Sequence, residues 1–287
     1  MNLQTDLQNN DLKYGLYIVS TPIGNLEDIT IRALEILRKS DYILCEDTRF
    51  SMKLLTRYKI KSKLISNHKF NEKKNVNKFI KILKSNKIVS LISDAGTPTI
   101  SDPGKILVQE CINNNINLIS IPGPSAPVAA LSISGFSNKF YFYGFFPEKK
   151  LEIKKDFEIL SQLNCSIIFF ISAKKFSRSV SVIKKYFFDR DILICKEITK
   201  FYEEYFRYNV NELDQKKIIL KGEITLVISE KKNENKSSDY LNESDKIKIK
   251  KLIKKLSIKE IVDLIKLGRN IKKKEIYNYC LKLKNEK

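Results

Sequence analysis

Three short segments of this chain combine glycine, proline and small polar residues in a way that suits ligand binding. They cover residues 21–25 (TPIGN), 93–104 (SDAGTPTISDPG) and 122–126 (PGPSA), and the apolar runs 15–19, 88–92 and 118–121 precede them. Glycine lets the backbone approach a ligand closely, and proline stiffens a loop before the ligand arrives. A plain turn needs only one such residue, so three loops of this composition favour a binding site over three structural turns.

The ligand expected for these loops is not a nucleotide polyphosphate. The sequence contains neither a G-x-x-x-x-G-K-[ST] motif nor a G-x-G-x-x-G motif. A neutral or zwitterionic nucleoside held by backbone groups fits them better. No metal site is expected, because the chain has a single histidine, His68, and five scattered cysteines without a C-x-x-C pair.

The charge of the chain is consistent with a polyanionic partner. The formal net charge is +20 and the pI is about 9.5, which is typical of proteins that bind nucleic acid. However, the chain has 45 lysines and only 8 arginines, and Ile, Asn, Phe and Tyr are also abundant. All of these except arginine have AT-rich codons, so a biased genome would also explain the lysines, and charge alone leaves both explanations open.

The sequence predicts a cytoplasmic protein. No stretch approaches the roughly 18 apolar residues of a membrane span. The first residues, MNLQTDLQNNDLKYG, contain no apolar region of the kind found in secretory signals. We therefore expect the cysteines to be reduced and mostly buried thiols.

Alternating strands and helices are expected to position the three loops. Strands are predicted at 15–19, 42–45, 88–92 and 118–121, and helices at 31–39, with Asp28 or Thr30 as the N-cap, at 75–83 and at 105–112. Such alternation is typical of a parallel α/β sheet, in which ligands bind beyond the carboxyl ends of the strands. The three loops all lie at that edge.

The second half predicts another α/β unit with a more mixed sheet. Its expected strands and helices are strands 140–146, 166–171, 192–195, 218–220 and 224–228, and helices 156–163 and 177–187. A polar linker at 231–244 precedes a basic helical module, in which Ser257 and Glu260 form a capping box and Gly268 is a C-cap. The predicted domains are therefore 13–124, 125–232 and 245–287.

Several motifs, in this order, resemble those of the tetrapyrrole methylase superfamily. They are TPIGNLEDIT-RAL (21–34), CEDTR (45–49), SDAGTP-ISDPG (93–104) and PGPSA (122–126), and the similarity continues at 142–147, 197–200, 221–223 and 256–281. More narrowly, the chain resembles the bacterial branch that methylates the 2′-oxygen of cytidine 1402 in 16S ribosomal RNA of the small subunit. The resemblance implies two α/β domains with S-adenosyl-L-methionine in the cleft between them, and a homodimer.

The resemblance also implies which residues line the cofactor site. By matching motif they are Pro22, Ile23, Gly24, Asn25, Asp94, Ala95, Gly96, Thr97, Pro98, Ser125, Ala126, Phe170, Gly222 and Thr225.

A group that takes the proton of the ribose hydroxyl is expected nearby, and the sequence leaves its identity open. Glu46 and Asp47 follow the second strand, and Lys200 and Glu223 lie in matching motifs of the second domain, so these four are the catalytic candidates. Each could equally be part of a surface salt bridge. The candidates for RNA contacts are Arg49, His68, Lys174, Lys175, Lys272 and Lys273, and His68 is also a candidate for the base.

The chain departs from the family pattern after the strand at 166–171. The family usually has an acidic residue there, followed by a histidine and an arginine, whereas this chain has Ile171 and then Lys174 and Lys175. Lysine keeps a phosphate-seeking charge but lacks the bidentate fork of arginine. The departure keeps a non-catalytic RNA-binding assembly factor open as an alternative. Methylation of a tetrapyrrole is a further alternative, which the basic charge disfavours.

Overall fold

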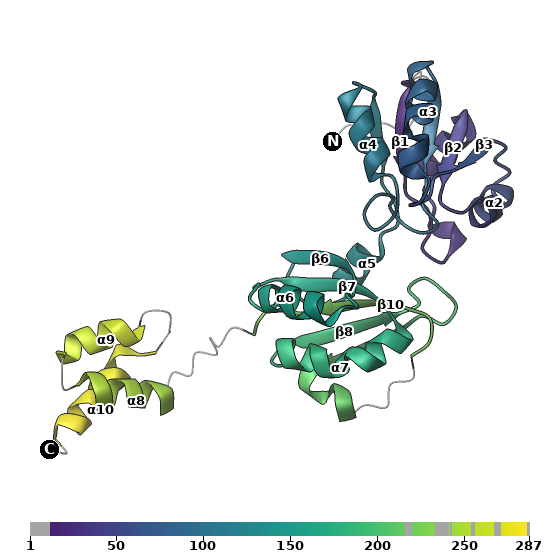
Figure 1. Cartoon of the computed structure of the whole chain (residues 1–287). Helices are drawn as coiled ribbons and strands as arrows, with labels where there is room; N and C mark the ends of the chain where they lie inside the picture. The colour runs from purple at the N-terminus through teal and green to yellow at the C-terminus, as the bar shows by residue number, and fades with distance from the viewer. Residues whose placement is uncertain are drawn as a thin grey trace. The chain divides into compact units, whose positions relative to one another are not determined.

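A computed structural model describes residues 12–215, 220–232, 241, 243–253, 256–266 and 271–285. The chain divides into two compact units, residues 1–230 and 231–287. The first unit holds two five-stranded sheets with their helices, and the second is a small helical unit (Figure 1).

The first sheet is entirely parallel, with strand order β3-β2-β4-β1-β5. Its strands are β1 Gly15–Val19, β2 Tyr42–Cys45, β3 Lys63–Ser66, β4 Ile88–Leu91 and β5 Leu118–Ile121. Because the pairs are parallel, all five carboxyl ends lie at one edge. Hence the loops at 21–25, 93–104 and 122–126 emerge together.

Helices cover both faces of this sheet. They are α1 Ile31–Lys39, α2 Thr48–Arg57, α3 Glu72–Lys84 and α4 Lys105–Asn113, with a 3-10 turn, η1, at Leu26–Asp28. Tyr17 and Val19 of β1 pack with α1 and α2, whereas Leu16 packs with α3 and α4 on the other face. The strands are apolar on both faces for this reason. Thr30 caps α1, and its side chain accepts a hydrogen bond from the backbone N–H of Ala33.

The second sheet is mixed, with strand order β6-β7-β10-β8-β9. Its strands are β6 Phe140–Phe145, β7 Ser166–Ser172, β8 Asp191–Lys196, β9 Glu204–Asn209 and β10 Glu223–Ile228. Only β6 and β7 pair in parallel, and the other pairs are antiparallel.

Helices α6 Lys150–Leu160 and α7 Ala173–Phe187 cover one face of the second sheet, and α5 Ala126–Ser132 covers the other (Figure 1). A 3-10 segment, η2, spans Val210–Gln215. Ile23 of the first loop packs against the same core as α5.

The helical unit contains α8 Glu243–Leu252, α9 Ile258–Lys266 and α10 Lys273–Asn285. Ile249, Ile261 and Ile276 form the centre of its core. The predicted capping box is present: the Ser257 N–H donates to Glu260 Oε2 at 2.8 Å, and the Glu260 N–H donates to Ser257 Oγ at 3.3 Å.

The predicted fold class and alternation are confirmed, while several elements were missed. The missed elements are α2, β3, α5 and β9. Helices α3, α6 and α7 begin earlier than predicted, at Glu72, Lys150 and Ala173. Gly268 and most of the strand expected at 218–220 lie outside the described residues. The domain boundaries stay predictions, and the one between 124 and 125 falls between β5 and α5.

All five cysteines lie in the described part of the chain and none forms a disulfide; Cys165 is half-buried and the others are buried. Among the described helices, none is both long and apolar enough to cross a membrane.

Candidate active site

A cavity of about 910 Å³ lies where the loops of the first sheet meet the ends of strands of the second. This volume is in the range of small-molecule and cofactor sites. Of the predicted cofactor residues, nine line it: Ile23, Asp94, Ala95, Gly96, Thr97, Ser125, Ala126, Phe170 and Thr225. Five others lie in the flanking loops without lining it: Pro22, Gly24, Asn25, Pro98 and Gly222.

Hydrogen bonds tie the three predicted loops to one another. Thr21 and Gly96 exchange backbone hydrogen bonds of 2.9 and 3.0 Å, which join the first loop to the second. Thr97 Oγ1 donates to the carbonyl of Pro124 at 3.2 Å, which joins the second to the third. The loops are therefore held in place before any ligand arrives, which lowers the entropy cost of binding.

Gly96 cannot be replaced without strain at this junction. Its φ is +77°, and a Cβ atom there would lie 3.3 Å from Ile23 Cγ2. Glycine therefore keeps the backbone of the second loop open to the cavity.

The opposite wall of the cavity carries a network of three charged side chains. Lys200 Nζ lies 2.7 Å from Glu223 Oε2 and 3.1 Å from Glu197 Oε1. Glu197 Oε1 also accepts a hydrogen bond of 2.7 Å from the backbone N–H of Glu223. The backbone at Glu197 and Thr199 is left-handed, with φ of +52° and +64°. Such strain in non-glycine residues concentrates at functional sites.

The network shifts the pKa values of Lys200 and Glu197. Burial lowers the pKa of Lys200, but hydrogen bonds to Glu223 and Glu197 outweigh burial and raise it. Burial likewise raises the pKa of Glu197, but the Glu223 N–H and Lys200 outweigh it and hold that pKa below its usual range. Lys200 therefore stays protonated at neutral pH and is suited to fixing negative charge rather than accepting a proton.

The first loop contacts this wall directly. The backbone N–H of Asn25 donates to Thr199 Oγ1 at 3.0 Å. A Cβ atom on Gly24 would lie only 2.5 Å from Lys200 Cγ. Gly24 and Asn25 thus act by closing the cavity wall rather than by lining it.

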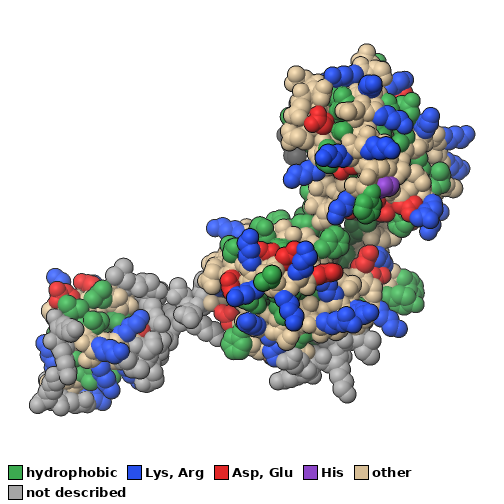
Figure 2. Space-filling model, viewed as in Figure 1, with side chains coloured by type: hydrophobic (Ala, Val, Ile, Leu, Met, Phe, Trp, Pro, Cys, Tyr) green, Lys and Arg blue, Asp and Glu red, His purple; other side chains and the backbone are tan. Residues whose placement is uncertain are grey.

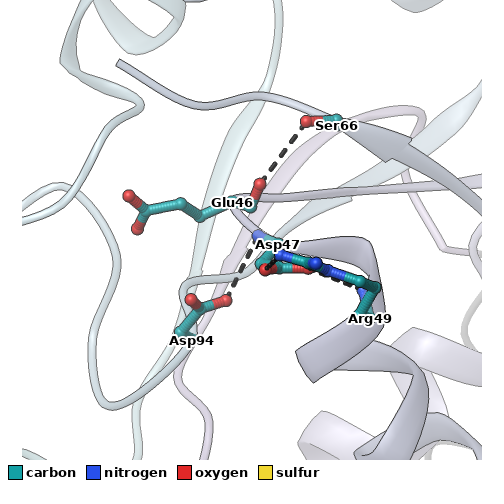
Figure 3. A network of polar contacts seen from close by, with 5 residues as sticks. All are labelled: Glu46, Asp47, Arg49, Ser66 and Asp94. Carbon is teal, nitrogen blue, oxygen red and sulfur yellow. Dashed lines mark hydrogen bonds and ion pairs between the residues drawn. The ribbon is translucent and has the colours of Figure 1, made fainter. Parts of the chain in front are cut away.

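The acidic candidates after β2 lie near Asp94, which lines the cavity (Figure 3). Asp47 caps α2 through the Arg49 N–H at 2.8 Å and forms an ion pair of 2.7 Å with the Arg49 guanidinium. The hydrogen bonds from Arg49 lower the pKa of Asp47 to about 2. The Asp47 N–H donates to Asp94 Oδ1 at 3.3 Å, and the Glu46 carboxylate points away from this pair. Neither Glu46 nor Asp47 lines the cavity.

Asp102 is a cavity residue that the sequence analysis did not single out. It lines the cavity together with Asp94. Burial, followed by the charge of Glu46, raises the pKa of Asp102 to about 6. The pKa values of Asp94 and Glu46 are also raised, mainly by burial. The repeated Asp-containing turn in residues 93–104 identified the loop that carries Asp102, but not which of its side chains line the cavity.

The residues predicted to contact RNA are dispersed. Lys175 lines the cavity and hydrogen-bonds to the Phe146 carbonyl and, at 3.1 Å, to Glu148, while Lys174 is exposed. Arg49 is exposed at the start of α2. His68 lies in the loop between β3 and α3.

Lys273 is the first residue of α10 and Lys272 directly precedes it, in the separate helical unit. Ile171, at the position of the family's acidic residue, is buried in the core of the second sheet and its edge borders the cavity.

Comparison with known proteins defines the class of this protein. A sequence profile of the tetrapyrrole (corrin/porphyrin) methylases matches residues 15–214. In solved structures, a cobalt precorrin-4 methyltransferase superposes with a TM-score of 0.55 at 18% identity, over 75% of this chain and 94% of that one. A uroporphyrin-III C-methyltransferase from Thermus thermophilus, complexed with S-adenosyl homocysteine, gives a TM-score of 0.52 at 13% identity, over 75% and 97%. The fold is that of a tetrapyrrole methylase.

Sequence relatives narrow the family further. The chain is 41% identical over 283 residues to the ribosomal RNA small subunit methyltransferase I of Rickettsia prowazekii, covering 95% of this chain and 98% of the relative. It is 45% identical over 221 residues to the protein of the same name from Thermotoga maritima, covering 75% and 98%. The chain belongs to the ribosomal RNA small subunit methyltransferase I family within the tetrapyrrole methylases.

Proposed function

We propose that this chain is an S-adenosylmethionine-dependent methyltransferase that methylates the ribose 2′-oxygen of cytidine 1402 in 16S ribosomal RNA of the small subunit. The observation that carries the proposal is the cavity, which is built by the family's motif loops and completed by the second sheet. The names of the relatives supply the class of substrate.

The residues of the cavity suit S-adenosylmethionine. Backbone at Gly96 is open to the cavity, and Ile23 and Phe170 offer apolar surface for a ring. Asp94 offers a carboxylate for a hydroxyl or ammonium group. Ser101 also lines the cavity, and its buried Oγ has no hydrogen-bond partner among the described residues.

When bound, S-adenosylmethionine supplies an electrophilic methyl group whose sulfonium needs no acid to leave. The protein must hold the ribose 2′-oxygen in line with the methyl carbon and the sulfur, and it must exclude water. It must also accept the proton of the ribose hydroxyl. The tied loops provide the rigid wall for alignment, and Ile23 and Phe170 exclude water. Lys200 forms an ion pair of 2.7 Å with Glu223 on the facing wall.

Asp102 is the carboxylate best suited to accept the proton. Its pKa of about 6 leaves it ionised at pH 7 while keeping it more basic than an ordinary aspartate. The Asp102→Asn variant should lose turnover but keep its affinity for S-adenosylhomocysteine, measured by calorimetry. Unchanged turnover in this variant would exclude Asp102 as the proton acceptor.

The test of the proposed function is transfer of labelled methyl from S-adenosylmethionine to 30S subunits that lack the modification, followed by mapping of the label. Label on a cytidine 2′-oxygen is the expected result. Binding of S-adenosylmethionine without transfer to subunits or to naked RNA would contradict the proposal and favour a non-catalytic RNA-binding factor. Uroporphyrinogen III serves as the control acceptor, and we expect no transfer to it.

We further propose that the chain acts in the cytoplasm as a homodimer. β6 is an edge strand of the second sheet, and its Phe140 and Tyr141 are 45% and 46% exposed, which is consistent with a protein interface. Light scattering should give the mass of two chains, and a monomeric mass at micromolar concentration would contradict this part.

A further inference from the structure

We propose that Phe70 is a platform on which an unpaired RNA base stacks, beside the nucleotide whose ribose enters the cavity. This inference rests on the proposed function and names how its RNA substrate is held. Single-stranded RNA is commonly bound by stacking of splayed bases on exposed aromatic side chains, with lysines near the phosphates.

The loop that carries Phe70 is tightly hydrogen-bonded, yet the ring points into solvent. The His68 N–H donates to Asn71 Oδ1 at 2.8 Å, and Asn71 Nδ2 donates to the Ser66 carbonyl at 3.3 Å. The Phe70 N–H donates to His68 Nδ1 at 3.2 Å. Nevertheless Phe70 is 92% exposed. A fixed backbone that holds a phenylalanine in water is unexplained by folding alone and points to a binding role.

The loop is also anchored from its far end. Glu72 is 5% exposed, and its carboxylate accepts hydrogen bonds from Ile106 N–H at 2.9 Å and Leu107 N–H at 3.2 Å at the start of α4. The Glu72 charge is therefore turned inward, away from the surface around Phe70.

Contacts link this loop to the cavity along the carboxyl edge of the first sheet. Ser66 Oγ donates to the Glu46 carbonyl at 3.4 Å, which joins the end of β3 to the end of β2. The Asp47 N–H then donates to Asp94, which lines the cavity. Phe70 therefore lies in the loop after β3, at the same carboxyl edge of the sheet as the loops that line the cavity.

The surface around Phe70 suits phosphates. Lys69, Lys73 and Lys74 are exposed on the loop and the first turn of α3. Figure 2 shows the single histidine of the chain (purple) on this surface among hydrophobic and basic side chains, with acidic ones to one side. Of the acidic groups at the end of the neighbouring strand β2, Glu46 interacts with His68 and Asp47 forms an ion pair with Arg49.

A second exposed phenylalanine, Phe201, does not share this setting. It is 93% exposed but is followed by Glu203 and Glu204, whose charges oppose a phosphate backbone. The RNA platform is therefore assigned to Phe70 rather than to Phe201.

The first experiment compares Phe70→Ala and Phe70→Trp with Phe188→Ala in methyl transfer to unmodified 30S subunits. Phe188 is 64% exposed at the end of α7, a helix whose other end borders the cavity, so it is an exposed ring far from the site. We expect Phe70→Ala to raise the KM for subunits about tenfold, with the KM for S-adenosylmethionine unchanged. Phe70→Trp should keep the wild-type KM because it keeps a stacking surface, and Phe188→Ala should match wild type.

The second experiment uses the absence of tryptophan from the natural sequence. Phe70→Trp and Phe188→Trp each introduce a single tryptophan, and a short unstructured oligocytidylate RNA is titrated into each. We expect quenching of fluorescence in the first variant and not in the second, because only a stacked indole is quenched.

The outcomes separate the two proposals. Wild-type methylation with an unchanged subunit KM in Phe70→Ala would overturn the platform and leave the proposed function standing. Selective quenching without any methylation by wild type would support the platform and contradict the proposed function. A change of oligomeric state in Phe70→Ala would show that the ring contacts another protein chain, which would overturn the platform.

Discussion

Replacement of Gly222 by alanine tests whether the Glu197 carboxylate organises the cavity wall. Gly222 precedes β10 with φ of +82°, and an added Cβ would collide with Glu197 Oε1 and lie 2.6 Å from its Cδ. A matched control is available in Gly135, which has φ of +72° but no atom within 4 Å of an added Cβ. Both variants place alanine at a positive φ, but only Gly222→Ala brings the new Cβ against the Glu197 carboxylate.

The magnitudes follow from these environments. Alanine in the left-handed region costs about 1–2 kcal/mol, of which about 0.4–1 kcal/mol is offset by the less flexible unfolded chain. Gly135→Ala should therefore lower stability only slightly. Gly222→Ala must also displace the Glu197 carboxylate from its hydrogen bonds with the Glu223 N–H and Lys200, at a further cost of about 1.5–3 kcal/mol.

Thermal denaturation and ligand calorimetry measure both consequences. For a unit of this size the extra cost corresponds to a melting temperature roughly 3–12 °C below that of Gly135→Ala. The affinity for S-adenosylhomocysteine should fall about tenfold in Gly222→Ala, because about 1.4 kcal/mol of binding is lost when the wall shifts, and should be unchanged in Gly135→Ala. Equal melting temperatures and equal affinities in the two variants would refute the organising role of Glu197.

Three further predictions concern buried charges. The pKa of Asp102 is about 6 in the folded state and about 3.9 in an unfolded chain, so the folded state binds more protons and its stability falls as pH rises between these values. In urea unfolding, Asp102→Asn should be about 1–3 kcal/mol more stable than wild type at pH 8 and equal to it near pH 4. Equal stability of the two proteins at both pH values would contradict this prediction. Glu72→Ala removes the acceptor for two buried N–H groups of α4 and should lower the unfolding free energy in urea by about 2–4 kcal/mol, with Glu72→Gln losing less; a neutral result would contradict the capping role. Arg190 is 1% exposed and donates to backbone carbonyls of two separate segments, at Ser161 and Leu163 and at Ser229. Arg190→Met should therefore cost about 3 kcal/mol or more in thermal unfolding, and a melting temperature equal to wild type would show that those carbonyls find other donors.

Local pattern was enough for the strands and helices whose own residues carry a strong signal. β1, β2 and β5 have the predicted bounds because short apolar runs bounded by proline or polar residues define them. β9 was missed because Glu204–Asn209 is a partly exposed edge strand with charged residues, and its pairing with β8 is a long-range choice. Helix α2 was missed because its N-cap, Asp47, was assigned to a catalytic loop.

The site was predicted in composition but not in detail. The three loops could be identified because glycine and proline act through the local backbone, and parallel alternation brings their strand ends together. Asp102 and Ser101 could not be assigned to the cavity, because the direction in which the loop 93–104 folds back decides which of its side chains line the cavity. The roles of Glu46 and Asp47 were also not readable, since the Arg49 pair and the direction of the Glu46 side chain are products of packing.

The sequence by itself determined the alternation of elements, the glycine-rich loops at one sheet edge and the family, because these depend on periodicity, backbone freedom and ordered motifs. Only the tertiary structure decided how the second sheet completes the cavity, with Lys200 held between two carboxylates and Asp102 buried enough to raise its pKa to about 6. Electrostatic environment depends on distance and desolvation between residues far apart in the chain, and neither is encoded in any local stretch of sequence.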